Sequence, residues 1–548
     1  KIKRVDQIID LLGLMGDTSD NVPGVPGIGE KTAQKLLADF DTVEGLLDRL
    51  DELKGKRKEI LAEFAEQARL SKRLVTIDTH VPLDLDVEDL KRREADQLEL
   101  TKIFSELEFN ALGKRLFGDD FEAGVKRMQA GIEDPHMVRT IKDVEHEYRL
   151  VDTAQGRASL ISELQQKDRF ALDLETTSLN PKTCQILGLA VSHTAHSGAF
   201  IPLPEDEAAN RAVLEELRPL LENQGIAKVG HNLKYDVAVL RWHGVDLAGP
   251  LHDTMVAAFL ATPDLRRSMD YLAQALLGYR PVPIADLIGE RGKEQLPMRE
   301  VPLEELTEYA AEDADIALQL WDRLEPLLEE SDQMRLYRQV EAPLIPVLAA
   351  MEHAGIRVDP EILRAISDDL AQKIERAAIR IEELAGEPFN LNSPAQLGQI
   401  LFEKLDLDPN ARRTAKSKQY KTDEMVLTRL SHEHEIARQI LDYRLCTKLK
   451  STYLDMLPGA IFSKTGRIHT SYEQAVAATG RMQSSGPNLQ NIPIRTEQGR
   501  EIRKAFVPGG PSYTLLSADY SQIELRIIAE ICGDRRMNEA FFEEEDIH

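Results

Sequence analysis

The sequence is poor in cysteine, has fewer basic than acidic residues, and contains no long apolar run. Its three cysteines, Cys184, Cys446 and Cys532, are scattered without metal-ligand spacing, which argues against a disulfide framework and indicates reduced thiols of an intracellular protein. No apolar stretch approaches the roughly 20 residues that a membrane span needs, and no signal peptide is visible. The 68 Lys and Arg against 94 Asp and Glu give a net charge of −26, which argues against a uniformly basic nucleic-acid-binding surface.

The length of 548 residues predicts several domains, about three to four. The sequence begins at Lys1 rather than Met and stops at His548 without a closing feature. We therefore interpret it as an internal fragment. The acidic total does not exclude nucleic acid binding, because local basic clusters and bound cations matter more than the sum.

The stretch from residue 170 to 179 is predicted to be a β-strand. Side chains alternate along a strand, so Phe170 and Leu172 point to one face while Asp173 and Glu175 point to the other. Carboxylates this close raise each other's pKa unless a cation lies between them. Hard divalent cations such as Mg²⁺ prefer oxygen ligands, and paired ions serve in-line phosphoryl chemistry. The alternative is a half-exposed strand whose solvent face happens to be acidic.

Residues 146–330 are predicted to form an α/β domain around this strand. Further strands are expected at 185–192 and 199–204, and a short strand at 228–230 leads into a helix that carries Asp236. A long amphipathic helix is expected at 303–327, where Tyr309 and Asp313 are four residues apart and so share one face.

These motifs together resemble the tyrosine-bearing branch of the DEDD-type 3′–5′ exonucleases, which have a ribonuclease H-like fold. The resemblance implies that four carboxylates hold two divalent metals, Mg²⁺ or alternatively Mn²⁺, directly or through water. Tyr309, together with Glu175, would position the attacking water. His231, beside the site, is interpreted as a polar neighbour that transfers no proton. The matching positions are the acids Asp173, Glu175, Asp236 and Asp313, the tyrosine Tyr309, and Leu179, Asn232 and Tyr235, which would contact a frayed single strand.

The first 115 residues read as helices with a glycine-rich turn at residues 24–29. The amides of this turn and the following helix N-terminus can form a phosphate-binding cradle; the alternative is an ordinary loop between two helices. The arrangement resembles the helix–hairpin–helix element of the 5′ nuclease domain that begins bacterial family A polymerases. The resemblance implies DNA contacts from Gly27, Gly29 and Lys31 and metal ligands at Asp17 and Asp20. The other acidic ligands of that family are missing from this sequence, so this part is not expected to cut DNA by itself.

Residues 116–145 are interpreted as a linker, and residues 335–548 as a mostly helical thumb followed by the start of an α+β palm. Apolar residues recur at helical spacing from 366 to 384, and Gly386 is a plausible stop. A strand containing Tyr513 and Leu515 is predicted to end at Asp519, with a helix starting near Ser521. A basic segment is interpreted as a phosphate-contacting tip, or alternatively as a polar loop without a partner. It contains Arg412, Arg413, Lys416, Lys418 and Lys421.

The stretches 479–495 and 515–526 closely resemble the first palm motif of the family A DNA polymerases. The resemblance implies that Asp519 binds both catalytic metals, that the Tyr520 carbonyl assists, and that Glu524 acts near the incoming sugar. A lone acid at a strand end is otherwise more often a helix cap. The residues implied to contact primer–template and nucleotide are Arg481, Asn488, Gln490 and Asn491.

Taken together, the resemblance to the bacterial DNA polymerase I family covers essentially the whole sequence. It implies template-directed DNA synthesis with proofreading, DNA and dNTPs as partners, no membrane, a monomer and a cytoplasmic, nucleoid-associated location. The fingers helix and second palm acid of the family are not found in this sequence, so a polypeptide limited to these residues is expected to act as an exonuclease without adding nucleotides. The competing hypothesis is a DNA-binding module without a working active site.

Overall fold

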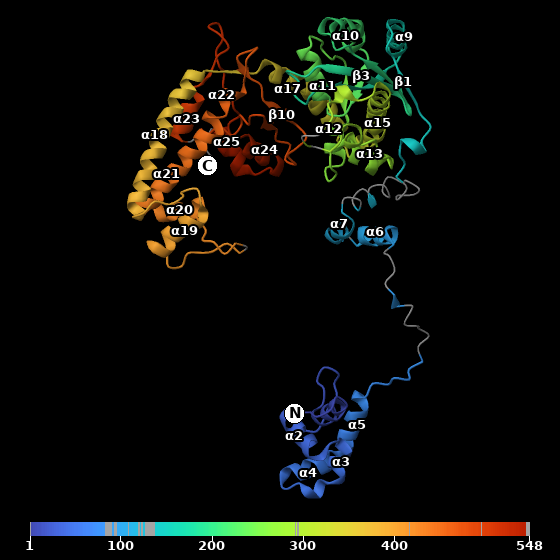
Figure 1. The fold of residues 1–548 in the computed structure, drawn as a ribbon, viewed down its shortest axis with the longest axis vertical. Coiled ribbons are helices and arrows are strands. Elements are labelled where there is room, and N and C mark those ends of the chain that lie inside the picture. The colour runs from blue at the N-terminus through green and yellow to red at the C-terminus, as the bar shows by residue number, and fades with distance from the viewer. Residues whose placement is uncertain are drawn as a thin grey trace. The chain divides into compact units, whose positions relative to one another are not determined.

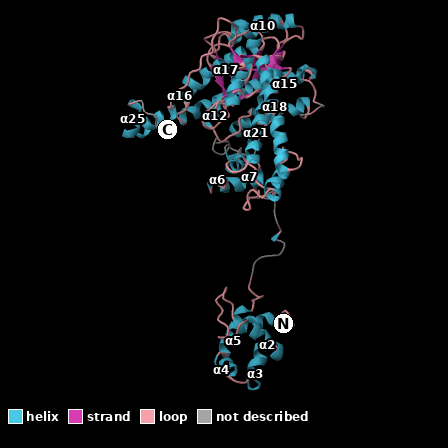
Figure 2. Ribbon diagram, turned by 90° about the vertical axis from the view of Figure 1, so that its left-hand side faces the viewer, coloured by secondary structure: helices cyan, strands magenta, loops and turns pink. Residues whose placement is uncertain are grey.

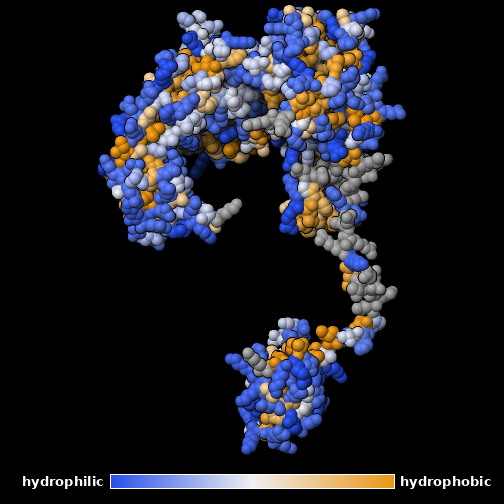
Figure 3. Space-filling model, in the orientation of Figure 1, coloured by the Kyte–Doolittle hydropathy of each residue, from blue (hydrophilic) through white to orange (hydrophobic). Residues whose placement is uncertain are grey.

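The computed structural model describes residues 2–543 except 83–89, 92–95, 108, 119–120, 122–123, 126–137, 291, 293–294, 416 and 495. The chain forms two compact units, Lys1–Ala95 and Asp96–His548. Hydrophilic side chains cover most of the visible surface (Figure 3), as a composition with 30% charged residues predicts. None of the helices formed by the described residues has the length and hydropathy to cross a bilayer.

The first unit is a small helical bundle (Figure 1). Its core contains Leu14, Leu37 and Leu46, none of which is more than 1% exposed. The buried Asp10 accepts a hydrogen bond from the Val43 amide at 2.8 Å and so fixes the start of the third helix. The helices are α1 (Gln7–Met15), α2 (Glu30–Phe40), α3 (Val43–Asp48), α4 (Lys56–Glu63) and α5 (Ala65–Val75), with a 3-10 turn at Leu50–Glu52.

A six-stranded mixed sheet with the strand order β1-β4-β3-β2-β5-β6 forms the centre of the second unit. The β2–β3 and β3–β4 pairs are antiparallel, whereas β1–β4, β2–β5 and β5–β6 are parallel. The predicted strands around residue 170 and at 185–192, 199–204 and 228–230 are therefore present. The six strands are β1 (Glu147–Leu150), β2 (Arg169–Thr176), β3 (Ile186–Thr194), β4 (Ser197–Pro202), β5 (Ala227–Gly230) and β6 (Leu251–Asp253).

Helices cover both faces of this sheet, with α9 and α10 on one side and α12, α13 and α15 on the other (Figures 1 and 2). The predicted helix at 303–327 is α15 (Leu303–Glu330), which packs across the sheet. Small residues allow this close contact, since a Cβ built on Gly198 would lie 3.0 Å from the Ala311 side chain. The other helices are α9 (Ala154–Leu164), α10 (Glu207–Leu221), α11 (Leu233–Trp242), α12 (Thr254–Ala261), α13 (Met269–Leu277) and α14 (Ile284–Ile288), with a 3-10 turn at Met298–Glu300.

The apolar core of the sheet region continues beyond α15. Tyr337 and Ile345 are fully buried in the same cluster as the sheet residues. The Tyr337 hydroxyl oxygen accepts a hydrogen bond from the Asp253 amide at 2.8 Å. Residues after 330 therefore complete this core. They lie in α16 (Met334–Leu336), a π-helical turn at Tyr337–Glu341 and α17 (Ala342–Ala354).

The remaining residues form a helical arm and two small sheets, of order β12-β7-β9-β8 and β10-β11. In the arm, α18 (Pro360–Ala385) packs along α21 (Glu435–Leu449) and ends at Gly386 with φ 75°, as predicted. The other elements are β7 (Ile356–Val358), α19 (Pro394–Gln399), α20 (Glu424–Ser431), α22 (Leu457–Ala460), β8 (Ile461–Phe462), β9 (Arg467–Ile468), β10 (Ser471–Glu473), β11 (Gln483–Ser485), α23 (Glu497–Arg503), β12 (Phe506–Val507), α24 (Ile523–Cys532) and α25 (Arg535–Phe542), with π-helical turns at Ile400–Lys404 and Lys450–Leu454.

The prediction of a strand ending at Asp519 is wrong. Residues 513–520 adopt no regular secondary structure, and Tyr513 and Leu516 are 68% and 89% exposed. The physical reason is the lack of a partner, because no described strand pairs with this segment and an unpaired strand leaves its backbone groups unsatisfied. The helix expected near Ser521 is present as α24, which begins at Ile523.

Two other predicted segments are described only in part. Most of the linker predicted at 116–145 lies outside the described residues, although Phe121 within it is 1% exposed and packs against Phe104. In the basic segment, Arg413 pairs with Glu403 at 3.2 Å and lies 3.9 Å from the centre of the Tyr420 ring. Lys416 lies outside the described residues.

Candidate functional site

Three carboxylates converge where β2 meets α15. Asp173 and Glu175 come from β2 and Asp313 from α15, and one oxygen from each lies within 4.8 Å of the others. Glu175 and Asp313 are only 6% and 7% exposed. This burial excludes the alternative of an acidic face in open solvent.

The fourth acid, Asp236, projects from the first turn of α11 and is 3% exposed. Burial raises the pKa of Asp173 to about 6. The pKa values of Glu175, Asp236 and Asp313 are raised well above the usual range, first by burial and then by the charge of Asp173. A site made of carboxylate oxygens that repel one another fits a hard divalent cation, which would remove this repulsion. These residues could therefore hold a metal ion.

Tyr309 lies one turn before Asp313 on α15 and shares a hydrogen bond with its carboxylate. Burial raises the pKa of Tyr309 far above that of a free tyrosine, and the charges of Asp313 and Glu175 raise it further. Its hydroxyl therefore stays protonated at neutral pH and acts as a hydrogen-bond donor next to the carboxylates.

A strained turn brings Asp236 toward this group. Asn232 has φ 61° and ψ 43°, a left-handed conformation, and its amide donates to the Asp253 carboxylate at 3.1 Å. The same carboxylate oxygen accepts from the Met255 amide at 2.8 Å and so caps α12. Asp253 thus holds both the Asn232 turn and the start of α12.

Asp253 was not among the residues predicted from the sequence. It is fully buried, its second oxygen has no partner among the described residues, and burial raises its pKa to about 6. The available signal was an Asp-Thr pair before an apolar helix, which is typical of an N-cap. Its neighbour His231 bonds the Thr254 hydroxyl at 2.8 Å, and burial lowers the pKa of this imidazole to about 4, so that it is neutral at pH 7.

The residues predicted to contact a single strand lie along one cleft with a volume of about 480 Å³. Leu179 is 80% exposed at its edge. The Tyr235 hydroxyl bonds the Thr176 hydroxyl at 2.7 Å and donates to the Ser178 carbonyl at 2.9 Å, which fixes the orientation of the ring. Asn232 lines the same cleft, and Ser485 from the β10–β11 hairpin lines its other side.

A buried ion pair connects the two sides of this cleft. Lys234 on α11 lies 2.6 Å from Glu352 on α17, and both side chains are 11% exposed. The same ammonium group donates to the Ser471 hydroxyl at 3.1 Å, while Glu352 accepts from the Tyr472 amide at 2.7 Å. The helix that carries Asp236 is thereby fixed to the β10–β11 hairpin.

In the first unit, the structure places the predicted phosphate-binding residues at the N-terminus of α2. Gly27 has φ 76° with open space where a Cβ would lie, Gly29 is the N-cap, and Lys31 is exposed in the first turn. Asp17 accepts a hydrogen bond from the Ser19 amide at 2.8 Å, and Asp20 is exposed. Within the described part of the chain, neither acid joins a group of three ligating side chains.

The residues predicted for the palm are exposed and are not brought together into a comparable cluster. Asp519, Tyr520 and Glu524 all face solvent, and Asp519 joins no group of ligating side chains among the described residues. Glu524 pairs with Arg481 at 2.8 Å. The remaining contacts are structural: Asn488 accepts from the Ser484 hydroxyl at 3.0 Å and from the Gln490 amide at 3.1 Å, and the Asn491 carbonyl accepts from the Tyr453 hydroxyl.

Comparisons with known protein families divide the chain into three matched parts. Residues 3–98 match the C-terminal part of the 5′–3′ exonuclease family, described as a SAM fold, and residues 148–329 match the 3′–5′ exonuclease family. Residues 360–548 match DNA polymerase family A.

Whole-chain comparisons give relatives in several bacteria. The chain is 40% identical to DNA polymerase I of Chloroflexus aurantiacus and 41% identical to that of Pseudomonas aeruginosa, over 99% of this chain and 60% of each relative. The enzyme of Bacillus subtilis is 38% identical over 99% of this chain and 58% of the relative. The chain thus spans about three fifths of the length of these curated relatives.

A solved structure is similar to much of the chain and extends the comparison to the fold. It is the POL domain of Pol1 from M. smegmatis in complex with DNA primer-template and dNTP, and it matches with a TM-score of 0.61 and 34% identity. The match covers 73% of this chain and 65% of that one. From the three family matches, the bacterial relatives and this fold, we conclude that the chain belongs to the family A DNA polymerases of the bacterial DNA polymerase I type.

Proposed function

We propose that residues 146–330 form a metal-dependent 3′–5′ exonuclease that hydrolyses the 3′-terminal phosphodiester of DNA. The observation that carries the proposal is the cluster of the half-buried Asp173 with the buried Glu175 and Asp313. Together with Asp236, these carboxylates would hold two Mg²⁺ ions, or alternatively Mn²⁺. Bound ions would supply a water of lowered pKa and stabilise the leaving oxygen.

Tyr309 and Glu175 would together orient the attacking water. Because Tyr309 stays protonated, its hydroxyl can orient a water by donating to the oxygen, but it is a poor base. Glu175 lies close enough to influence the pKa of Tyr309 and can accept a hydrogen bond from the same water. The pair would therefore align the attacking water with the terminal phosphodiester.

The cleft beside the carboxylates would bind the frayed 3′ end. Leu179 offers an exposed apolar side chain that can wedge between bases, and the fixed ring of Tyr235 offers a stacking surface. Stacking of this kind tolerates any base, as a proofreading exonuclease requires. Asn232, in its left-handed turn, lines the same cleft.

The flanking parts would handle duplex DNA. We assign residues 1–115 to the DNA-binding C-terminal part of a 5′ nuclease domain, 116–145 to a linker, and 335–548 to thumb and palm. Here Gly27, Gly29 and Lys31 would bind backbone phosphate, and Asp17 and Asp20 would be metal ligands. In the palm, Asp519 would be a metal ligand that serves DNA synthesis from dNTPs, with Tyr520 and Glu524 near the nucleotide. The primer–template contacts would come from Arg481, Asn488, Gln490 and Asn491.

The test is degradation of a 3′-labelled single-stranded oligonucleotide by the full chain, with Mg²⁺ and with EDTA. Release of mononucleotides from the 3′ end only with the metal supports the proposal. Asp173→Ala should abolish the release, while the matched control Asp168→Ala, at an exposed acid five residues away, should retain it.

DNA binding by the Asp173→Ala protein completes the test, because it distinguishes a lost ligand from a lost fold. Bound DNA without hydrolysis supports a role for Asp173 in chemistry. If the unmodified chain binds the oligonucleotide but releases no nucleotide in either condition, the alternative of a binding module is favoured.

A further inference from the structure

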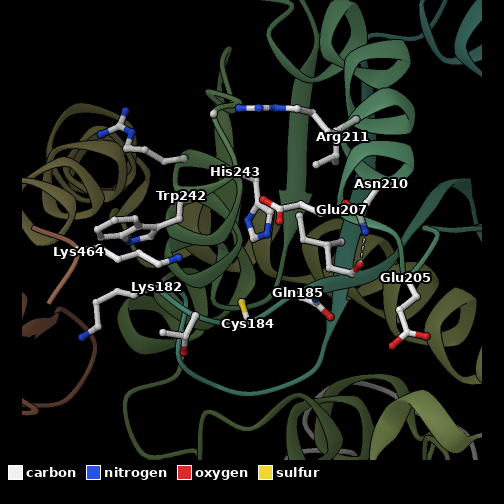
Figure 4. A pocket seen from close by; sticks show the side chains of 15 residues that line it. Lys182, Cys184, Gln185, Glu205, Glu207, Asn210, Arg211, Trp242, His243 and Lys464 are labelled. Carbon is white, nitrogen blue, oxygen red and sulfur yellow. Dashed lines mark hydrogen bonds between the residues drawn. The ribbon is translucent and has the colours of Figure 1, made fainter. Parts of the chain in front are cut away.

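A second cavity, of about 390 Å³, adjoins the single-strand cleft. It lies between the β2–β3 connection, helix α10, the C-terminal end of α11 and the β8–β9 turn (Figure 4). Lys182 and Trp242 line both the cavity and the cleft. Cys184, in the wall of the cavity, lies within hydrogen-bonding range of the Tyr235 hydroxyl in the cleft. The two spaces therefore share part of their walls.

The cavity carries an excess of positive charge. Its basic residues are Lys182, Arg211, Arg241 and Lys464, and its carboxylates are Glu205 and Glu207. Burial lowers the pKa of Lys182, and the charge of Glu352 opposes this shift. Arg241 is neutralised by Asp246 at 3.0 Å, and Glu205 pairs with Arg299, which lies outside the cavity.

Within the described part of the chain, no carboxylate forms an ion pair with the other three cations of the cavity, Lys182, Arg211 and Lys464. Glu207 alone offsets them among the lining residues. Unpaired cations gathered in one cavity are unusual in a chain with a net charge of −26.

The side chains are arranged to meet an anion at the junction with the cleft. Figure 4 shows Lys182 and Lys464 beside Trp242, with Arg211 and Asn210 on the opposite side. The Trp242 ring packs against the His353 ring, with ring centroids 4.4 Å apart. Lys182 donates only a long hydrogen bond, 3.4 Å, to the His469 carbonyl, so its ammonium group has capacity for a further acceptor.

We propose that this basic cavity is a phosphate-binding subsite that receives nucleic acid next to the exonuclease cleft. The inference deepens the proposed function and rests on it, because the cleft is taken as the path of the single strand. Two sources can supply the phosphate: an internal phosphodiester of the strand whose 3′ end lies at the carboxylates, or a free nucleoside monophosphate. Lys182 and Lys464 contact the phosphate in either case.

The first test is binding without hydrolysis. Fluorescence anisotropy in EDTA would compare the full chain, the double variant Lys182→Ala/Lys464→Ala and the control Lys142→Ala/Lys167→Ala, whose lysines are exposed elsewhere. The probe is a labelled single strand of about 12 nucleotides, within the usual range of site sizes. We expect about 10-fold weaker binding for the first variant only, and a salt slope smaller by about 0.7 for each phosphate contact removed.

The second test uses hydrolysis to distinguish the two sources of phosphate. An internal phosphodiester predicts that Lys182→Ala/Lys464→Ala raises the KM for the long strand by a larger factor than the KM for a dinucleotide, because the dinucleotide can meet Lys182 in the cleft but does not reach Lys464 in the cavity. A free monophosphate predicts that added deoxynucleoside monophosphate alters dinucleotide hydrolysis by the parent but not by this variant.

Equal strand affinity and equal response to monophosphate in parent and variant would overturn the subsite. If anisotropy shows the expected difference but no preparation hydrolyses DNA, the subsite stands and the exonuclease proposal fails. The two hypotheses are thus tested separately.

Discussion

The carboxylates around β2 and the acidic residues of segment 513–524 both match motifs of the same polymerase family, yet the structure arranges them differently. Around β2, Asp173, Glu175 and Asp313 from two elements converge in one cluster, and burial raises the pKa values of these acids and of Asp236 on α11. In segment 513–524, Asp519 and Glu524 face solvent, and the only ion pair there is with Arg481, among the residues that the structure describes.

This difference shows that acidic residues of a sequence motif form a metal-binding cluster only where folding brings their carboxylates together. Each carboxylate in the β2 cluster is buried by packing that its own sequence segment does not provide, since α15 and α11 must both dock on the sheet. The free energy of folding thus holds carboxylates of like charge close together. A cation that binds between them removes their mutual repulsion, and this relief favours its binding. The exposed Asp519 has no clustered carboxylate beside it among the described residues, so no repulsion of this kind would favour cation binding there.

The largest expected difference is between two substitutions that each remove one acid, one in each region. Asp173→Ala should lower metal-dependent hydrolysis by at least about 100-fold, because losing a ligand should cost no less than losing a group that merely orients one. Asp519→Ala should leave the exonuclease rate unchanged. The measurement is the initial rate of mononucleotide release, and equal losses in the two variants would remove the distinction between the regions.

Tyr309→Phe should have the next largest effect, a fall in kcat of about 10- to 100-fold, since general positioning of a reacting proton contributes in this range or above. Metal affinity should be retained because the substitution leaves the clustered carboxylates of Asp173, Glu175 and Asp313 in place. Since the pKa of Tyr309 is raised far above its usual value, the pH–rate profile of the parent should show no ionisation of this residue near neutral pH. A fall in activity caused only by weaker metal binding would contradict this role.

The metal should stabilise the β2 region in a pH-dependent way. Asp173 has a folded-state pKa of about 6 against its usual 3.8, so between these values the folded chain binds a proton that the unfolded chain lacks. The free energy of unfolding of the metal-free protein therefore falls as pH rises through this window. Mg²⁺ offsets the loss, so the Tm difference between Mg²⁺ and EDTA should be larger at about pH 7.5 than at about pH 5, by roughly 2–4 °C for each kcal/mol.

Asp173→Asn supplies the control for this titration, because the amide removes the charge at nearly constant shape. Its metal-free Tm should vary less with pH between about 4 and 6 than that of the parent. An identical pH dependence in the two proteins would show that other groups dominate.

The smallest effect is expected at the exposed ion pair between Arg481 and Glu524. Arg481 and Glu524 are 77% and 74% exposed, and ion pairs in this setting contribute about 0–1 kcal/mol. Arg481→Ala should therefore leave the Tm within about 2 °C of the parent. A larger fall in Tm, measured by thermal unfolding at low and high salt, would mean that the region around Arg481 and Glu524 is more tightly packed than the exposure of these side chains indicates.

The sequence predicted the residues of the carboxylate cluster around β2 because they lie in short local patterns. Asp173 and Glu175 share a strand, and Tyr309 and Asp313 share a helical turn, so spacing alone relates each pair. The strand, the long helix and the stop at Gly386 followed from periodicity and from a conformation that glycine favours.

The contacts that spacing could not predict join distant segments. Lys234 and Glu352 are 118 residues apart, and Lys182 and Lys464 lie farther apart still, so no local signal connects them. Asp253 was overlooked because a helix cap and a positioning acid look alike in sequence. The strand predicted before Asp519 failed because β-structure depends on a partner, which local propensity does not provide.

The burial of Tyr337 and Ile345 beneath the sheet also limits where a chimeric protein could be joined within this chain. The exonuclease motifs end with Asp313 and helix α15 ends at Glu330, but the apolar socket that supports β6 is filled from α17 and the turn before it. A graft or recombination event that joined two proteins at residue 330 would leave this socket open and the Asp253 amide without its acceptor. A junction after Ala354 would keep this apolar core complete, so the segment that must be exchanged as a unit extends beyond the helix that carries Asp313.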